Sequence, residues 1–282
     1  MSDATNRNVF MLISLFRQYK YITNHVSKRL NNHHSQDKSL NINLLPIVRY
    51  EEVSGITYQQ AWDYQTEIHN ALKANKVLWR DFDEDEKQTM RQEHSILFCE
   101  HSHVYTLGKS GSEDHLLISE ELRASESIEY FKINRGGDIT YHGPGQLTVY
   151  PIFDLDEFYN DLHKYVRNLE EVVIRMLATY GIVGYREPDF TGVWIAPSEQ
   201  QALKRKICAI GVHMSRWVSL HGLALNVNTD LDMFDNIVPC GIKEADMEVT
   251  SVARELGKKV DLQDAKYRLK TTFAEVFQYA YK

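Results

Sequence analysis

Cysteine, proline and glycine are all scarce in this sequence. Its 282 residues include three cysteines, six prolines and fourteen glycines. Three cysteines in a chain of this length exclude a disulfide framework, and their positions show no C-x-x-C spacing of the kind that indicates structural zinc. We therefore interpret Cys99, Cys208 and Cys240 as free thiols.

Long apolar runs are also missing. The longest one near the N-terminus, Val9–Phe16, spans eight residues, far short of the ~20 that a transmembrane helix needs. The twelve histidines show no convincing metal-ligand spacing. We expect no metal, no cofactor, and neither a membrane nor a nucleic-acid partner. The composition, 43% apolar and 25% charged, is that of an ordinary globular protein.

The N-terminal residues differ in charge from the rest. Residues 1–36 carry five basic side chains and one acid, which gives them a charge of +4. Because the net charge of the chain is −7, the remaining residues carry −11. We predict a poorly ordered basic extension over residues 1–43 and one domain over residues 44–282. A cleaved organellar transit peptide is the alternative, because such segments are basic and poor in acids. The expected location is the cytoplasm, or the mitochondrial matrix if residues 1–36 are such a peptide.

The apolar pattern of the remaining chain predicts an α+β fold with a mixed β-sheet flanked by helices. Helical spacing extends over Thr57–Ala74 and again from Leu162 to Leu177, with Gly181 as the expected C-terminal cap. Residues 250–281 are helical in pattern as well. The predicted strands outnumber the helices and do not alternate with them. They cover Ser95–Cys99, Val104–Leu107, Leu147–Phe153, Gly192–Ile195, Lys206–Val212 and Leu223–Val227.

Glycine is concentrated in one segment. Gly136, Gly137, Gly143 and Gly145 all lie within RGGDITYHGPGQ (135–146), directly before a predicted strand. Such a backbone can adopt positive φ and allows a ligand to approach closely. The segment matches neither GxGxxG nor a Walker A loop, which disfavours nucleotide phosphate binding. The pattern fits a binding loop and equally a tight structural turn with a core histidine.

A lysine and two cysteines form the second candidate. Lys206 is two residues before Cys208, and Cys240 lies between Pro239 and Gly241. A nearby ammonium favours the thiolate that a cysteine nucleophile needs. In a regular strand Lys206 and Cys208 would face the same side, so spacing alone does not decide which thiol the lysine serves. The alternative is that the thiols are small buried apolar groups and that residues 204–206 form a solvated basic turn.

The sequence resembles the lipoyl/octanoyl transferases over roughly residues 46–260. The segment RGGDITYHGPGQLTVYP is similar to the signature of that family, and EHSHVYTLGKSG precedes it as the family order requires. The motifs GVWIAP, KICAIGVHMSRWVSLHGLALNVNTDL, PCGI and TSVARELG follow in order. The resemblance implies a catalytic core of the biotin/lipoate ligase type.

The resemblance also implies roles for individual residues. The catalytic pair it indicates is Cys240 as nucleophile and Lys206 as its partner, and Cys208 occupies a position the family does not require. The substrate-binding residues it implies are Arg135, Gly136, Gly137, Asp138, Ile139, Thr140, Tyr141, His142, Ala209, Ile210, Gly211, Gly222, Leu223 and Ala224.

The implied activity is octanoyl transfer through a cysteine thioester. The donor would be octanoyl-acyl carrier protein, and the acceptors would be lipoyl domains of 2-oxoacid dehydrogenase E2 subunits and the glycine cleavage H protein. Because acyl carrier proteins are acidic, we expect a basic patch, for which Lys204, Arg205 and Arg216 are candidates. Two alternatives stay open: an ATP-dependent lipoate or biotin ligase, and a non-catalytic module that binds acyl groups or lipoyl domains.

Overall fold

The main β-sheet of the computed structural model is mixed. The structure describes residues 45–79, 82–83, 92–199, 201–238 and 247–282, so the predicted nucleophile Cys240 lies outside the described residues. Within them the sheet has nine strands in the order β12-β1-β2-β6-β10-β9-β8-β7, and β11 pairs with β9. The strands are β1 (Ile47–Val53), β2 (Glu93–Cys99), β6 (Gln146–Ile152), β7 (Gly184–Glu187), β8 (Phe190–Ile195), β9 (Lys204–Ser215), β10 (Val218–Asn226), β11 (Met247–Val249) and β12 (Ala280–Tyr281).

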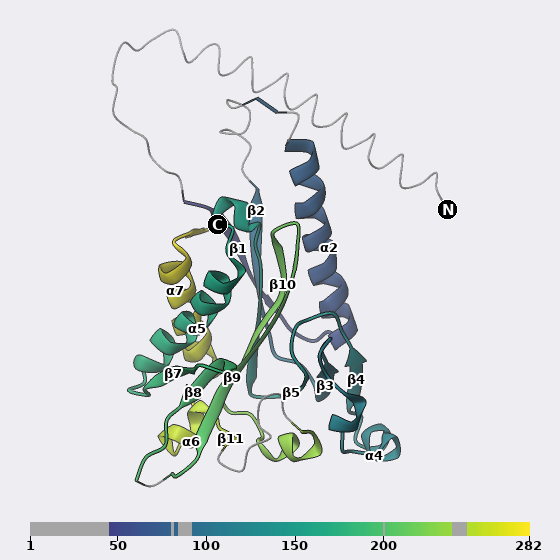
Figure 1. Cartoon of the computed structure of the whole chain (residues 1–282), viewed down its shortest axis with the longest axis vertical. Helices are drawn as coiled ribbons and strands as arrows, with labels where there is room; N and C mark the ends of the chain where they lie inside the picture. The colour runs from purple at the N-terminus through teal and green to yellow at the C-terminus, as the bar shows by residue number, and fades with distance from the viewer. Residues whose placement is uncertain (1–44, 80–81, 84–91, 200, 239–246) are drawn as a thin grey trace. The chain divides into compact units, whose positions relative to one another are not determined.

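Helices cover both faces of this sheet. Helices α5 (Leu162–Ala178) and α7 (Leu262–Phe277) lie side by side on one face, and α2 (Tyr58–Leu78) lies along the other (Figure 1). The alternation of side chains in β2 explains this arrangement: Ile96 and Phe98 pack into the core beneath α5 and α7, whereas Leu97 and Cys99 pack beneath α2. The predicted α+β class with a mixed, helix-flanked sheet is confirmed.

Local sequence signals set the ends of the two long helices. Thr57 and Gln60 form a capping box at the start of α2, and the helix extends one turn beyond the predicted end. Helix α5 begins at its N-cap Asp161, and its buried residues recur every three or four positions. Gly181 adopts φ +77° just beyond its end, as expected for a residue that stops a helix.

The C-terminal residues form two helices and a strand. Helix α6 (Val252–Leu256) ends at Gly257, which has φ +66°, and α7 ends at Gln278, which has φ 56°. Strand β12 then pairs with β1. The prediction of helix over residues 250–281 is therefore correct for α6 and α7 and wrong for the two breaks and the last strand, because left-handed backbone at Gly257 and Gln278 interrupts the helix.

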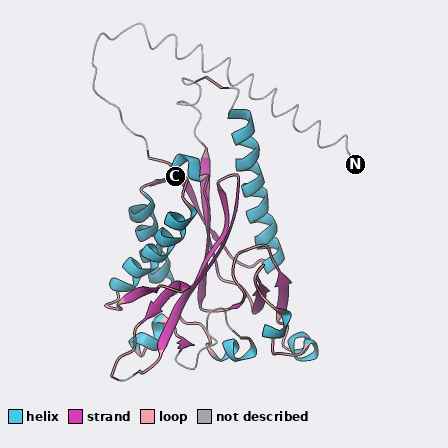
Figure 2. Ribbon diagram, in the orientation of Figure 1, coloured by secondary structure: helices cyan, strands magenta, loops and turns pink. Residues whose placement is uncertain are grey.

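A second, smaller sheet carries the glycine-rich segment. It has the order β4-β3-β5, formed by β3 (Val104–Leu107), β4 (Glu129–Lys132) and β5 (Ile139–His142), with helix α4 (Glu120–Ser125) beside it (Figure 2). Short 3-10 helices are η2 (Glu113–His115), η3 (Leu155–Glu157) and η4 (Asp232–Asn236). The segment 135–146 is thus not a loop throughout: β5 forms its centre, between turns at Gly137 and Gly145, which have φ +83° and +80°.

Candidate active site

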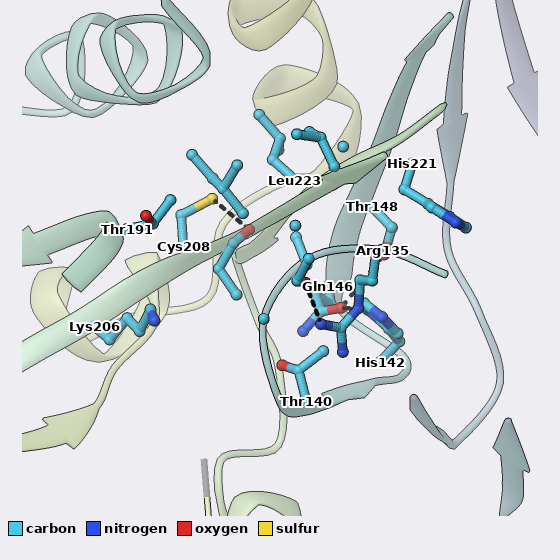
Figure 3. Close-up of a pocket in the computed structure, with 18 of the residues that line it drawn as sticks. Arg135, Thr140, His142, Gln146, Thr148, Thr191, Lys206, Cys208, His221 and Leu223 are labelled. Carbon is cyan, nitrogen blue, oxygen red and sulfur yellow. Dashed lines mark hydrogen bonds between the residues drawn. The ribbon is translucent and has the colours of Figure 1, made fainter. Parts of the chain in front are cut away.

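A cavity of about 460 Å³ lies where β5 and the turn before it meet strands β8, β9 and β10. Figure 3 shows Lys206 and Thr191 toward one end of it and Arg135 with His142 toward the other. Lys206 and eleven of the fourteen predicted substrate-binding residues line this cavity. These eleven are Arg135, Gly136, Gly137, Thr140, His142, Ala209, Ile210, Gly211, Gly222, Leu223 and Ala224.

The other three predicted binding residues lie outside the cavity wall. Because β5 alternates its side chains, Thr140 and His142 reach the cavity, while Ile139 and Tyr141 are fully buried in the core of the small sheet. The Asp138 carboxylate lies 2.5 Å from His115 Nδ1 and accepts the Ile139 N–H at 2.7 Å. These three residues therefore support the glycine-rich segment on the side away from the cavity.

Arg135 brings positive charge into the cavity. The guanidinium donates to the Thr106 carbonyl at 2.6 Å and to the Thr106 hydroxyl at 3.0 Å, and the side chain is almost completely buried. Its stem crosses Gly211, where an added Cβ would lie 2.9 Å from Arg135 Cδ. Any larger residue at Gly211 would therefore push the arginine out of place.

A chain of hydrogen bonds fixes the floor of the cavity. His142 Nδ1 donates to Gln146 Oε1 at 2.8 Å, and Gln146 Nε2 donates to Asn226 Oδ1 at 2.9 Å. The Asn226 amide donates to the Thr250 carbonyl at 3.0 Å, and the Thr250 hydroxyl donates to Glu255 at 2.7 Å. Because both amides are oriented by their other partners, the His142 proton resides on Nδ1. Thr106 donates to His142 Nε2 at 3.3 Å, so both ring nitrogens are occupied.

Two of the three basic residues expected to receive an acidic carrier are already paired. Arg205 donates to both carboxylate oxygens of Glu255, at 2.8 and 3.2 Å, and its side chain is 4% exposed. Lys204 lies 3.4 Å from the Glu187 carboxylate. Each of these two side chains therefore already compensates a carboxylate within the fold, and the basic patch stays a prediction.

The backbone of β9 between Lys206 and Cys208 differs from the regular strand that was expected, although both residues line the cavity. Trp194 pairs with Lys206 and Val193 pairs with Cys208, so one additional residue, Ile207, stands in β9. Ile207 and Cys208 consequently both lie in the core beneath α5. This bulge is the physical reason for the difference, since an inserted residue interrupts the alternation.

Cys208 is chemically unsuited to act as a nucleophile. Its side chain is fully buried, and its sulfur points away from the Lys206 amine (Figure 3). Desolvation raises the pKa of the Cys208 thiol well above its usual range and outweighs the opposing effect of the Lys206 charge. The thiol is therefore protonated and inert at neutral pH.

Three histidines on and beside the cavity are neutral. Burial lowers the pKa of His142 and of His221 to about 3, and that of His101 to about 4. His221 Nε2 lies 2.7 Å from Asn134 Oδ1, and His101 Nε2 lies 2.7 Å from the Tyr150 hydroxyl. Neutral rings held in this way act as structural hydrogen-bonding groups in the ground state.

The protein is expected to lose stability as the pH falls from 7 to 5. Below the usual histidine pKa of ~6.5 the unfolded chain binds protons, whereas folded His142, His221 and His101 stay neutral until the pH is far lower. Each of the three then reduces the free energy of unfolding by about 2 kcal/mol between pH 7 and 5. Urea unfolding at the two pH values measures the effect.

A matched pair of variants assigns this pH dependence. His142→Gln removes one buried ring and is expected to flatten the dependence by about 2 kcal/mol. His163→Gln changes an exposed histidine at the start of α5 and is expected to leave the dependence as in the wild type. A wild-type stability that stays constant over this range would contradict neutral burial of the three rings.

Sequence reasoning missed several residues of the cavity wall. Tyr58 lines the cavity from the start of α2 and stacks on His142 with the ring planes 13° apart. Gln146, Thr148, Tyr150 and Thr191 also contribute. Only Gln146 carried a sequence signal, since it ends the glycine-rich segment; the others come from elements whose approach depends on tertiary packing.

Neither a membrane helix nor a metal cluster is found in the part of the chain that the structure describes. None of its helices combines the length and apolar character needed to span a bilayer. The same residues contain no group of three or more histidine, cysteine, aspartate or glutamate side chains arranged to hold a metal ion.

Comparison with known families places the cavity in a known fold. Residues 57–274 match the model of the lipoyl protein ligase A/B catalytic domain. The chain belongs to this family. The octanoyltransferase of Cytophaga hutchinsonii is 54% identical over 224 residues, which cover 79% of this chain and 90% of that protein. The octanoyltransferase of Christiangramia forsetii is 50% identical over 222 residues, or 78% of this chain and 92% of that protein.

Solved structures of the family share the fold at low sequence identity. A bipartite lipoate protein ligase from Thermoplasma acidophilum superposes with a TM-score of 0.57 at 16% identity, over 85% of this chain and 86% of that chain. A lipoate-protein ligase A bound with ATP gives a TM-score of 0.57 at 16% identity, over 85% and 88% of the two chains. The lipoate ligase-like core that the family resemblance implied is confirmed.

Proposed function

We propose that this chain is an acyltransferase of protein lipoylation that moves an octanoyl group from octanoyl-acyl carrier protein to a lysine of a lipoyl domain, through a thioester on Cys240. Two octanoyltransferases at 54% and 50% identity over most of their lengths support octanoyl transfer. The observation that carries the proposal is the Lys206 amine in the wall of a cavity to which residues 209–211 and 222–224 supply small and apolar groups.

The cavity wall suits an acyl chain. Residues 209–211 of β9 and 222–224 of β10 pair with one another and supply glycine, alanine, isoleucine and leucine to the wall. A hydrophobic slot of this kind holds an octanoyl chain by burial of apolar surface and excludes water from the thioester. The polar groups gather near Arg135 and Lys206, at the two ends visible in Figure 3.

The assignment of Cys240 as nucleophile follows from the family resemblance of its Pro-Cys-Gly segment, and its chain neighbours and the burial of Cys208 support it. The described residues before and after Cys240 include Phe234 and Val249, and both line the cavity. Val249 pairs directly with Lys206, and the Thr250 N–H donates to the Lys206 carbonyl at 2.9 Å. The buried, protonated thiol of Cys208 cannot serve this purpose.

The first half-reaction forms the acyl-enzyme. Lys206 in its neutral form takes the proton of the Cys240 thiol, and the thiolate attacks the carbonyl carbon of the octanoyl thioester. The carbon–sulfur bond to the carrier breaks, and the departing thiolate takes the proton back from Lys206. One thioester replaces another, so the step requires no ATP.

The second half-reaction forms the amide. The neutral amine of the acceptor lysine attacks the Cys240 thioester, and Lys206 accepts the proton that the nitrogen loses. The tetrahedral intermediate expels the Cys240 thiolate, which recovers a proton from Lys206. The products are an octanoylated lipoyl domain and the free enzyme.

The proposed partners follow from the family resemblance and fit this chemistry. Octanoyl-acyl carrier protein is the donor, and lipoyl domains of 2-oxoacid dehydrogenase E2 subunits and the glycine cleavage H protein are the acceptors. The relatives named above come from bacteria, so a cytoplasmic location accompanies the proposal. We retain residues 1–43 as an extension and residues 44–282 as one octanoyltransferase domain.

The decisive test is octanoyl transfer without ATP. Purified full-length protein, octanoyl-acyl carrier protein and an apo lipoyl domain are mixed, and intact mass spectrometry follows both proteins. We expect an octanoylated lipoyl domain and, without the acceptor, an octanoyl adduct on the enzyme. Transfer only from free octanoate and ATP would identify a ligase instead, and binding without any transfer would identify a non-catalytic module. Either result would contradict the proposal.

A further inference from the structure

Trp194 lies directly against the lysine of the proposed catalytic pair. Trp194 is fully buried on β8 and pairs across the strands with Lys206. The Lys206 Nζ lies 5.1 Å from the centroid of the Trp194 ring. At this separation the face of an indole attracts a cation, and tryptophan does so more strongly than phenylalanine or tyrosine.

The backbone of β8 is shaped to let the lysine reach this position. Gly192 has φ +129°, and an added Cβ would lie 2.9 Å from Lys206 Cε and 2.5 Å from the Cys208 carbonyl oxygen. Only glycine leaves room here for the lysine stem. The Gly192 N–H donates to Glu170 Oε1 at 3.1 Å, which ties this point of β8 to α5.

The bulge in β9 completes the arrangement. Because Ile207 is the additional residue, it turns into the core while Lys206 stays opposite Trp194. The Trp194 indole N–H donates to the Phe190 carbonyl at 3.3 Å, which fixes the plane of the ring. Three independent features, the bulge, Gly192 and the tethered indole, thus converge on one lysine side chain.

We propose that Trp194 is a positioning residue that holds the Lys206 amine at the cavity wall and stabilises its protonated form. The inference rests on the proposed function, in which Lys206 takes up a proton from a thiol and later from an amine. Each time, the ammonium forms against the face of the indole. The ring thereby makes a nearly buried lysine basic enough to accept that proton, although burial alone disfavours the charged form.

Among the residues that the structure describes, other charged groups near this corner lie on α5, in the turn between β7 and β8, and on β9. Glu170 from α5 is fully buried and held by Arg167 and Arg186, at 2.8 and 3.2 Å. Asp189, in the turn between β7 and β8, also lines the cavity. On β9 itself, Lys204 and Arg205 are paired with carboxylates. Substitution of Trp194 leaves all of these charges in place, so a change in the pKa of Lys206 reports the ring.

The test measures the pKa of Lys206 directly. Full-length wild type, Trp194→Phe and Trp194→Leu are labelled with acetic anhydride across a pH series, and peptide mass spectrometry gives the labelled fraction of Lys206. We expect the pKa of Lys206 to fall by about 0.5 unit in Trp194→Phe and by about 1 unit or more in Trp194→Leu, because the cation loses its aromatic partner. Lys204 in the same digest serves as the internal reference.

Trp217→Phe is the matched control. Trp217 is partly exposed in the β9–β10 turn and does not line the cavity, so this variant is expected to keep the wild-type pKa of Lys206. In transfer assays Trp194→Phe is expected to lower kcat about tenfold with KM nearly unchanged. An unshifted Lys206 pKa in both Trp194 variants, with wild-type circular dichroism, would overturn the inference. Labelling measures the pKa of Lys206 without enzyme turnover. Failure of the proposed function would instead appear as absent octanoyl transfer in the transfer assays.

Discussion

Replacing Cys240 by alanine is expected to abolish ATP-independent octanoyl transfer and the octanoyl adduct on the enzyme. The acyl group then has no thiol to receive it, since the Cys208 thiol is buried and protonated and Cys99 lies in the core beneath α2. Loss of a covalent nucleophile removes the reaction path as a whole, so the residual rate is expected to be lower by at least ~10⁴. Single-turnover mass spectrometry measures both losses.

The matched control is Cys208→Ala. It removes a thiol of the same chemistry two residues from Lys206, at a site where only one buried sulfur atom is lost from the core. We expect it to retain the adduct and most of the transfer rate, with a modest loss of stability. An adduct that disappears in Cys208→Ala and persists in Cys240→Ala would reverse the assignment of the nucleophile.

Replacing Lys206 by alanine is expected to lower kcat/KM of octanoyl transfer by about 10²–10⁴-fold. The variant lacks the amine that takes the thiol proton, so Cys240 must react from its small equilibrium fraction of thiolate. Raising the pH supplies thiolate without the lysine, and we therefore expect part of the loss to be recovered at pH 9. Rates of acyl-enzyme formation at pH 7 and pH 9 check both statements.

Two further variants separate basicity from charge. Lys206→Arg keeps a cation but cannot accept a proton, and it is expected to remain as slow as Lys206→Ala at pH 7. Lys204→Ala removes a lysine two residues away, whose partner is Glu187 outside the cavity, and it is expected to stay near the wild-type rate. Equal activity of Lys206→Ala and the wild type would exclude the lysine from the mechanism.

Elements with a clear period could be predicted from the sequence, whereas those that depend on distant partners could not. The stripe of Leu169, Val173 and Leu177 indicated α5 directly, and the apolar run in β2 indicated a buried strand. Strand β1 was missed because Val48 is the one fully buried residue among its seven, and Arg49, Glu51 and Glu52 are charged. It is held by parallel pairing with β2 and with both residues of β12. No local pattern reports such pairing.

The residues of the candidate site could be predicted from their sequence motifs, whereas the geometry of the site could not. The motifs brought Lys206 and most of the cavity wall together, but the bulge at Ile207 and the pairing of Arg205 with Glu255 depend on neighbours from β8 and α6. Spacing along one strand cannot show an inserted residue, because the insertion is defined only against the partner strand. For the same reason, a basic run such as residues 204–206 cannot reveal which of its charges the fold has already compensated.

The hydrogen bonds beneath the cavity have a direction. The donors of His142, Gln146 and Asn226 all point the same way along the row, which ends at the backbone carbonyl of Thr250. Neither side-chain amide in the row can flip without placing a donor opposite a donor or an acceptor opposite an acceptor. The proton position on an imidazole in the cavity wall is thus dictated by a backbone carbonyl just beyond β11, a group that can only accept and so holds one tautomer of His142.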